Sequence, residues 1–196
     1  MDTQQQFFSI THPFTVSVDV LALGSAIPNN VEFEQMMPPS FRLASQISAI
    51  ETSALRPLKH LGEHASDLSE FLNAQAKKID LMMSYILTLD DGVTKRLDGT
   101  SFGGSHFTYI SNEIIQPDQL IAAKVFIDEG NCAIFSIARV ISCTVNETTG
   151  EKLINATFVK ISDDAQEQLV RTSLHVQTLQ LKERSESRKL NDTDDE

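Results

Sequence analysis

The glycine-rich run at residues 99–104, GTSFGG, is the first stretch of the sequence to test for chemistry. A nucleotide-binding P-loop places its glycines between a strand and a helix and carries a lysine that reaches the phosphates. The run has no such lysine, and the residues after Gly103 and Gly104 are strand-like rather than helical. The sequence therefore does not predict a P-loop here.

The histidines and the paired aspartates are the other side chains that could take part in catalysis or metal binding. His60 and His64 have the i, i+4 spacing that can ligate zinc on a helix, but there is no HExxH frame and no nearby cysteine. We expect them to be surface or seam histidines. The pairs at residues 90–91 and 163–164 are expected to be charges at helix ends. The sequence therefore predicts no enzyme, no metal site and no cofactor.

The composition narrows the class of protein and its partners. The chain has 196 residues, 41% of them apolar, which is sufficient for a hydrophobic core. A formal net charge of −11 argues against nucleic acid polymers and anionic membrane surfaces as partners. No signal peptide and no apolar run long enough to cross a membrane is visible, so we expect a cytoplasmic protein. Cys132 and Cys143 share one strand-like run and are expected to stay reduced.

Most of the remaining sequence has the patterns of a small β-barrel. Apolar residues alternate from Phe14 to Val20, and further strands are expected at 101–110, 120–127, 133–145 and 153–161. Residues 24–39 are expected to form a loop. A helix is expected at 163–184, with one apolar side made by Val170, Leu174, Gln177 and Leu181. Residues 185–196 are charged and are expected to be disordered.

Between the first strand and the others lies a helical region, residues 40–91, with Ser40 as the expected N-cap. From residue 58 to residue 89 apolar residues recur in alternating steps of three and four, which is the heptad pattern of a coiled coil. The helix at 57–91 would be about 48 Å long, which is longer than a domain of this size requires. We define its seam as the residues expected at the oligomer interface: Leu61, Leu68, Leu72, Gln75, Ile79, Met82 and Ile86.

The heptad pattern leaves two questions open. The residue types along the seam do not select a number of chains, and a long core helix of a monomer is the alternative to an oligomer. Gln75 is the polar residue on the seam. It sets the register by pairing with its symmetry mate, or it lies where the helices separate.

The predicted domain order is a first barrel strand at 7–23, a helical insertion at 40–91, the remainder of the barrel with its closing helix at 93–184, and a tail at 185–196. The simplest topology pairs the first strand with the later ones. The fold class is therefore mainly β, with an antiparallel barrel from which the coiled-coil helix extends.

The order of these elements and several short motifs resemble bacterial PilZ domains, which are receptors for cyclic di-GMP. Residues 99–107 are similar to the Asp/Asn-x-Ser-x-x-Gly signature, and residues 4–10 are similar to the Arg-Arg-x-x-x-Arg segment before the first strand. Residues 158–180 resemble the closing strand and helix, and residues 72–80 resemble the inserted helix of atypical tetrameric members. The resemblance implies a six-stranded barrel, a homotetramer and cyclic di-GMP as the ligand.

The chain departs from the ligand-binding motifs of that family. Gln4, Gln5 and Ser9 replace arginines, and Gly99 replaces Asp or Asn, while Ser101 and Gly104 match. Arginine binds phosphate and guanine with two hydrogen bonds at once. Each charge-assisted bond contributes roughly 1.5–3 kcal/mol, so losing two arginines costs about 3–6 kcal/mol, or two to four powers of ten in affinity. Lys95 and Arg96, just before the loop, are the candidates for compensation.

Two functional hypotheses follow. The first is a non-enzymatic oligomeric PilZ-type regulator or scaffold of cyclic di-GMP-related signalling that binds the nucleotide weakly or not at all and acts on an unidentified protein partner. The second is a functional cyclic di-GMP receptor with a rewritten site, in which Ser101, Gly104, Lys95 and Arg96 act with the segment from Gln4 to Ser9.

Overall fold

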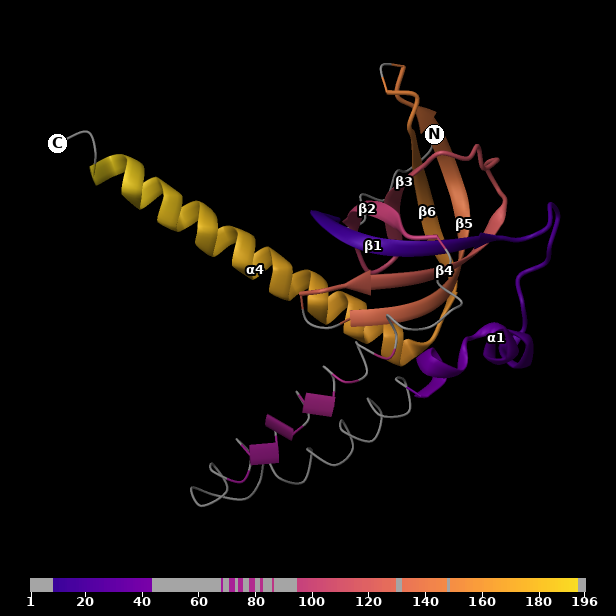
Figure 1. The fold of residues 1–196 in the computed structure, drawn as a ribbon, viewed down its shortest axis with the longest axis horizontal. Helices are drawn as coiled ribbons and strands as arrows, with labels where there is room; N and C mark the ends of the chain where they lie inside the picture. The colour runs from indigo at the N-terminus through magenta and orange to yellow at the C-terminus, as the bar shows by residue number, and fades with distance from the viewer. Residues whose placement is uncertain are drawn as a thin grey trace, which may run out of the picture.

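The computed structural model describes residues 9–43, 95–129, 132–147 and 149–193, together with single helical residues between 68 and 86. Within these ranges the chain forms a closed barrel of six antiparallel strands and a long C-terminal helix (Figure 1). The predicted fold class is therefore confirmed. No helix of these ranges is both long and apolar enough to cross a membrane.

The barrel order is β1-β2-β3-β6-β5-β4. The strands are β1 Ile10–Val20, β2 Leu97–Phe102, β3 His106–Ser111, β4 Leu120–Ile127, β5 Cys132–Val145 and β6 Lys152–Ile161. Since β1 pairs with both β2 and β4, the region between β1 and β2 leaves the barrel and returns to it. The strand order therefore places residues 21–96 between two neighbouring strands of the barrel.

Two apolar clusters hold the barrel. The inner cluster fills the barrel with alternate residues of every strand, among them Val16, Phe102, Tyr109 and Ile154, all 0% exposed. The outer cluster covers the outside of β4 and β5, where Phe33, Met37 and Phe41 pack on Phe135 and Ile137 among others. Because both faces are covered, β4 is buried at almost every position.

Helix α1, Asn30–Met36, carries the first residue of this outer cluster and corrects the expectation of a continuous loop at 24–39. Its start is a capping box: the Asn29 side chain accepts from Glu32 N at 3.0 Å, and Glu32 accepts from Asn29 N at 2.8 Å. A second helical stretch begins at residue 39, so Ser40 lies inside it rather than at its N-cap. Pro39 occupies the first helical position. Proline is common there because no hydrogen bond is lost.

A second correction concerns residues 101–110, which do not form one strand. The chain reverses at residues 103–105, and Gly103 N donates to His106 O at 2.9 Å. Strands β2 and β3 therefore form a tight hairpin, and the glycines make the turn. Both cysteines are free and lie on β5, as expected. Burial raises the pKa of Cys132 to about 12, so its thiol is inert at neutral pH.

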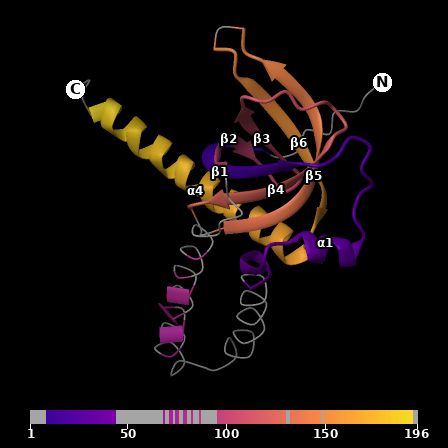
Figure 2. The same cartoon turned by 45° about the vertical axis from the view of Figure 1, so that its right-hand side comes forward.

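Helix α4, Asp163–Thr193, closes one end of the barrel and then projects away from it (Figures 1 and 2). It is longer than the predicted 163–184, because residues 185–193 contain no glycine or proline and several strong helix formers. The expectation of a disordered tail is therefore wrong for residues 185–193. The residues of α4 that are buried are on another side than the predicted apolar one: Leu169, Thr172, Ser173 and Val176. Val170, Leu174 and Leu181 are 41%, 54% and 58% exposed.

Candidate functional site

The candidate site is the ligand loop, which we define as residues 99–104 at the end of β2 and in the turn to β3. The Ser101 Oγ lies 2.7 Å from the Thr108 Oγ1, and the Thr100 Oγ1 lies 2.6 Å from the same Thr108 oxygen. A one-residue irregularity between Gly99 and Ser101 places both hydroxyls beside Thr108. Ser101, one of the two residues that fit the signature, is thus already hydrogen-bonded within the barrel.

The other end of the loop, Gly99, lies under an aromatic ring. A Cβ atom at this position would lie 2.3 Å from Phe14 Cζ and 2.4 Å from both Phe14 Cε atoms. The ring is held in place because Phe14 is 8% exposed and packs edge-on against Phe102, with centroids 5.6 Å apart. A bulge in β1 between Thr11 and Phe14 sets the register that brings the ring here. The space that an Asp or Asn side chain would need at this position is filled by Phe14.

Gly104, the second match to the signature, is covered by helix α4. A Cβ atom there would lie 2.9 Å from Val170 Cγ2. The Gln166 side chain donates from Nε2 to Gly104 O at 3.3 Å. The glycine therefore permits the close approach of the helix to the turn, which is a packing role.

Ser9 lies at the same end of the barrel as the turn. It precedes Ile10, which pairs with Phe102 in the β1–β2 ladder, and it is exposed. Gln4 and Gln5 lie outside the described residues. The structure therefore brings Ser9, Ser101 and Gly104 to one end of the β1–β2–β3 sheet, and it covers Gly99 in between.

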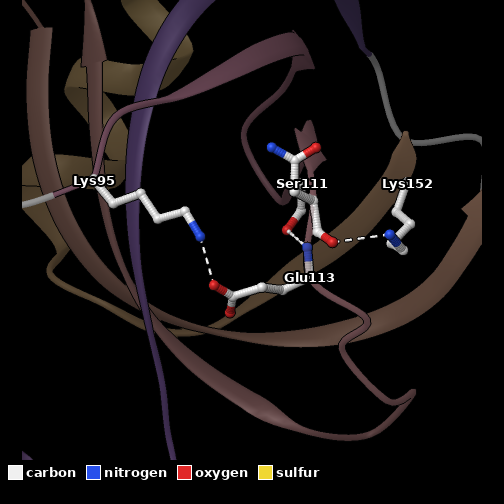
Figure 3. A network of polar contacts seen from close by, with 5 residues as sticks. Lys95, Ser111, Glu113 and Lys152 are labelled. Carbon is white, nitrogen blue, oxygen red and sulfur yellow. Dashed lines mark hydrogen bonds and ion pairs between the residues drawn. The ribbon is translucent and has the colours of Figure 1, made fainter. Parts of the chain in front are cut away.

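Lys95 and Arg96 lie at the opposite end of β2, before its first residue. The 6 residues of β2 separate them from the turn by roughly 20 Å. The Lys95 Nζ lies 2.5 Å from the Glu113 Oε1, beyond the end of β3 (Figure 3). The hydrogen bond from Lys95 lowers the pKa of Glu113 below its usual value. These cations are not brought to the turn, so the compensation expected from the sequence is not supported.

Lys95 and Glu113 belong to a small polar network at this end of the barrel. Glu113 N donates to the Ser111 Oγ at 3.0 Å, and Lys152 Nζ donates to Asn112 O at 2.8 Å (Figure 3). These contacts tie the end of β3 to the starts of β2 and β6. Lys95 and Lys152 are therefore explained by their structural contacts in this network.

A row of small polar side chains crosses the outside of the barrel beside the loop. The register places Ser101, Thr108, Asn155 and Ser142 side by side on β2, β3, β6 and β5. Alternation with buried neighbours directs them outward. The Asn155 Oδ1 has no hydrogen-bond partner. The row can form neutral hydrogen bonds, but it contributes no positive charge for a phosphate.

The sequence reasoning missed Phe14, Thr108 and Val170 as residues that define the loop. Thr108 could have been found from the alternation of β3 once the turn at 103–105 was recognised. Phe14 and Val170 could not, because their contacts depend on a strand register and a helix position set by residues far away in the chain. Among the described residues, no three His, Cys, Asp or Glu side chains gather as a metal site would require.

Most of the described seam residues of the helical region are exposed. Leu68, Ile79, Met82 and Ile86 are helical and 48%, 39%, 66% and 41% exposed. Leu72 and Gln75 are helical and half-buried. Leu61 lies outside the described residues. The described seam is a mainly apolar helix face that is only partly covered in the single chain.

Comparison with solved structures identifies the fold. No protein-family model matches the sequence, and no curated protein matches it. Among solved structures, a pathogenic protein from Xanthomonas campestris aligns with 90% of this chain and 91% of its own, at 12% identity and a TM-score of 0.53. That protein is described as a tetrameric PilZ domain self-assembled through a helical bundle. This chain has a PilZ-type fold.

A second solved structure, the Bacillus subtilis inhibitor of motility MotI/DgrA, covers 43% of this chain and 42% of its own, at 11% identity and a TM-score of 0.39. The Xanthomonas likeness extends over nearly the whole chain, so it includes the region inserted in the PilZ-type barrel. At this level of identity the comparison establishes the fold, and the ligand and partners have to be argued from the residues themselves.

Proposed function

We propose that this chain is a non-enzymatic, homo-oligomeric PilZ-type regulator or scaffold of bacterial cyclic di-GMP-related signalling. In this role it acts through protein contacts, with an unidentified protein as its partner, and binds cyclic di-GMP weakly or not at all. One observation carries the proposal: the ligand loop is filled by the protein's own side chains. Phe14 covers Gly99 and Val170 lies against Gly104.

The chemistry of the ligand explains why this matters. Cyclic di-GMP carries two phosphates, which require cations within hydrogen-bonding distance. Ser9 stands where an arginine is expected, and Lys95 is paired with Glu113 at the far end of β2. The loop therefore offers hydroxyl groups and a glycine turn, which together supply neither the charge nor the space for the nucleotide.

The titratable groups support a non-enzymatic role. Burial raises the pKa of Tyr109 and of Cys132, and both side chains lie in the inner cluster of the barrel. A catalytic tyrosine or cysteine is activated by a lowered pKa and must reach a substrate. These two groups have the opposite properties and are better explained as core residues.

Assembly through the seam is the second part of the proposal. Burying an apolar side chain contributes roughly 1.5–3 kcal/mol, and the seam presents several at helical spacing. The similar Xanthomonas protein is described as a tetramer built through a helical bundle. We therefore propose that four copies associate through Leu61, Leu68, Leu72, Gln75, Ile79, Met82 and Ile86, which leaves four barrels free to hold a partner.

Calorimetric titration of the purified protein with cyclic di-GMP at physiological salt tests the ligand part. We expect no heat of binding up to roughly millimolar nucleotide. An established cyclic di-GMP receptor titrated with the same nucleotide stock is the control. Micromolar binding would contradict the proposal and favour the alternative, a functional receptor with a rewritten site, in which Ser101, Lys95 and Arg96 would be the first residues to mutate.

A further inference from the structure

The hydroxyl of Tyr109 is a buried polar group that the packing of the barrel does not explain. The side chain is 0% exposed and belongs to the inner cluster, where Phe107 stacks on its ring with centroids 5.8 Å apart. Within the described part of the chain, the Tyr109 Oη has no hydrogen-bond partner. A buried hydroxyl without a partner destabilises the folded state, whereas phenylalanine would fill the same space without that cost. The hydroxyl therefore points to a group that it can bind.

Cys143 is the reactive side chain nearest to this hydroxyl along the barrel wall. Tyr109 pairs with Ile154 of β6, and Ile154 pairs with Cys143 of β5, so the three residues form one row across three strands. Tyr109 and Ile154 lie in the inner cluster and Cys143 packs against it, so all three face inward. Neighbouring strands are about 4.8 Å apart, which separates the outer two Cα atoms by roughly 10 Å. The long tyrosine side chain can cover much of this distance.

The electrostatics of Tyr109 agree with this geometry. Burial raises the pKa of Tyr109, and the charges of Cys143 and Glu113 raise it further. Both groups are therefore close enough to act on the hydroxyl. Glu113 lies beyond the end of β3, in the polar network at the end of the barrel away from the β2–β3 turn (Figure 3). The hydroxyl and the Cys143 thiol thus lie toward this end of the barrel.

The two cysteines of β5 differ in their access to solvent. Cys132, the first residue of the strand, is 1% exposed and forms a hydrogen bond with Thr172, and burial raises its pKa to about 12. Cys143, near the other end of the strand, is half-buried. Oxidation of a cysteine depends on the exposure of its sulfur and on its thiolate form. Cys143 combines access to solvent with a nearby hydroxyl that can bind an added oxygen.

We propose that Cys143 is a site of reversible oxidation by hydrogen peroxide, and that the Tyr109 hydroxyl donates a hydrogen bond to the oxygen of the resulting sulfenic acid. The thiolate sulfur attacks one oxygen of the peroxide, so a sulfur–oxygen bond forms and the oxygen–oxygen bond breaks. Sulfur is oxidised by two electrons and the peroxide is reduced. The departing hydroxide takes up the proton that the thiol released, which gives water.

The product gives the hydroxyl the partner that it lacks. A thiol is a weak hydrogen-bonding group, whereas the oxygen of a sulfenic acid accepts a hydrogen bond from a phenol. Cys132 is buried at the other end of β5, so it cannot form a disulfide with Cys143, and a small thiol from solution would reduce the sulfenic acid. The expectation that both cysteines stay reduced then holds for Cys143 only without peroxide. The site lies in the barrel and does not depend on assembly through the seam.

Trapping of sulfenic acid with a 1,3-diketone tests the site. The purified full chain is treated with hydrogen peroxide and labelled, and mass spectrometry measures the label at each cysteine. We expect about tenfold more label at Cys143 than at the buried Cys132. Tyr109→Phe keeps the ring and should lower the label at Cys143 roughly fivefold, the worth of one ordinary hydrogen bond, with more sulfinic acid in its place. Ser142→Ala removes a hydroxyl from the neighbouring, outward-facing position and should leave the label unchanged.

Four results would overturn the inference. No label at Cys143 would mean that its thiol is not oxidised in the folded barrel. Equal label at both cysteines would mean that the reagent reaches unfolded chains. Equal label in the wild type and in Tyr109→Phe would mean that the hydroxyl does not bind the added oxygen. Urea denaturation of the unoxidised Tyr109→Phe variant should give the stability of the wild type or more, and a clear loss would mean that the hydroxyl is already bonded within the barrel. The proposed function stands after any of these results, because it involves neither residue.

Discussion

The ligand loop and the seam differ in what fills them. At the loop, the Phe14 ring from β1 fills the space beside Gly99, Val170 from α4 lies against Gly104, and Ser101 hydrogen-bonds to Thr108. At the seam, apolar side chains at regular spacing are only partly covered in the single chain. The comparison teaches that the loop of this PilZ-type barrel is packed by the protein's own side chains, whereas its apolar helix face is only partly covered. In the proposed function, the seam is the surface through which the chain associates with other copies.

The largest expected effect comes from breaking the seam. Leu72→Asp with Ile79→Asp should abolish assembly, because two carboxylates would be buried among apolar side chains at the interface. The barrel should stay folded, since its two clusters contain neither residue. Light scattering measures the mass and circular dichroism the fold. Native mass in the double variant would mean that the seam is not the interface.

The next effect concerns the filled end of the loop. Gly99→Asp should destabilise the barrel by about 3–5 kcal/mol, because the new side chain meets the Phe14 ring and brings a carboxylate into a buried site. Urea denaturation measures this free energy of unfolding. Gly150→Asp is a useful contrast, since no atom lies near that position, although its positive φ adds strain. If Gly99→Asp were as stable as the wild type, the ring could move and the loop would be open.

A smaller effect is expected at the turn. Gly104→Ala should cost about 1 kcal/mol, since the added methyl lies 2.9 Å from Val170 Cγ2. Val170→Ala removes that atom, so it should restore most of the loss in the double variant. A double-mutant cycle of urea denaturations isolates this coupling. Additive effects of the two changes would show that Gly104 serves the turn and not the approach of α4.

The smallest effect is a pH dependence at His106, next to the turn. Burial lowers the pKa of His106 below its ordinary value of 6.5. The unfolded chain therefore binds a proton at a higher pH than the folded one, and stability declines as the pH falls from about 6.5 through the folded pKa. His106→Gln should reduce this decline in urea denaturation between about pH 7.5 and pH 5. An unchanged slope would assign the pH dependence to other histidines.

The later strands could be predicted closely because their signals are local. The expected limits of β4 are exact, and those of β5 and β6 differ from the structure by one residue at one end. Alternation and clear turns define these strands. The α1 helix was also marked locally, by Asn29 with Glu32 three residues later, but the flanking prolines favoured a loop.

The state of the loop could not be predicted in the same way. The sequence shows that Gly99 departs from the signature and that Ser101 and Gly104 match it. Phe14 fills the space beside Gly99 because of the register between β1 and β2, and these two strands are separated in the chain by the helical region. The side of α4 that faces the barrel could not be predicted for a similar reason. The exposed Val170, Leu174 and Leu181 are more apolar than Thr172 and Ser173, which are nevertheless buried.

The central claim is that the exposed seam is the working surface of this protein, so its mass in solution is the most direct test. Size-exclusion chromatography with light scattering on the wild type, over a dilution series, measures the number of chains. We expect four chains, with dissociation only at high dilution. A single chain at every concentration would contradict the account, because the apolar face of the helical region would then have no partner.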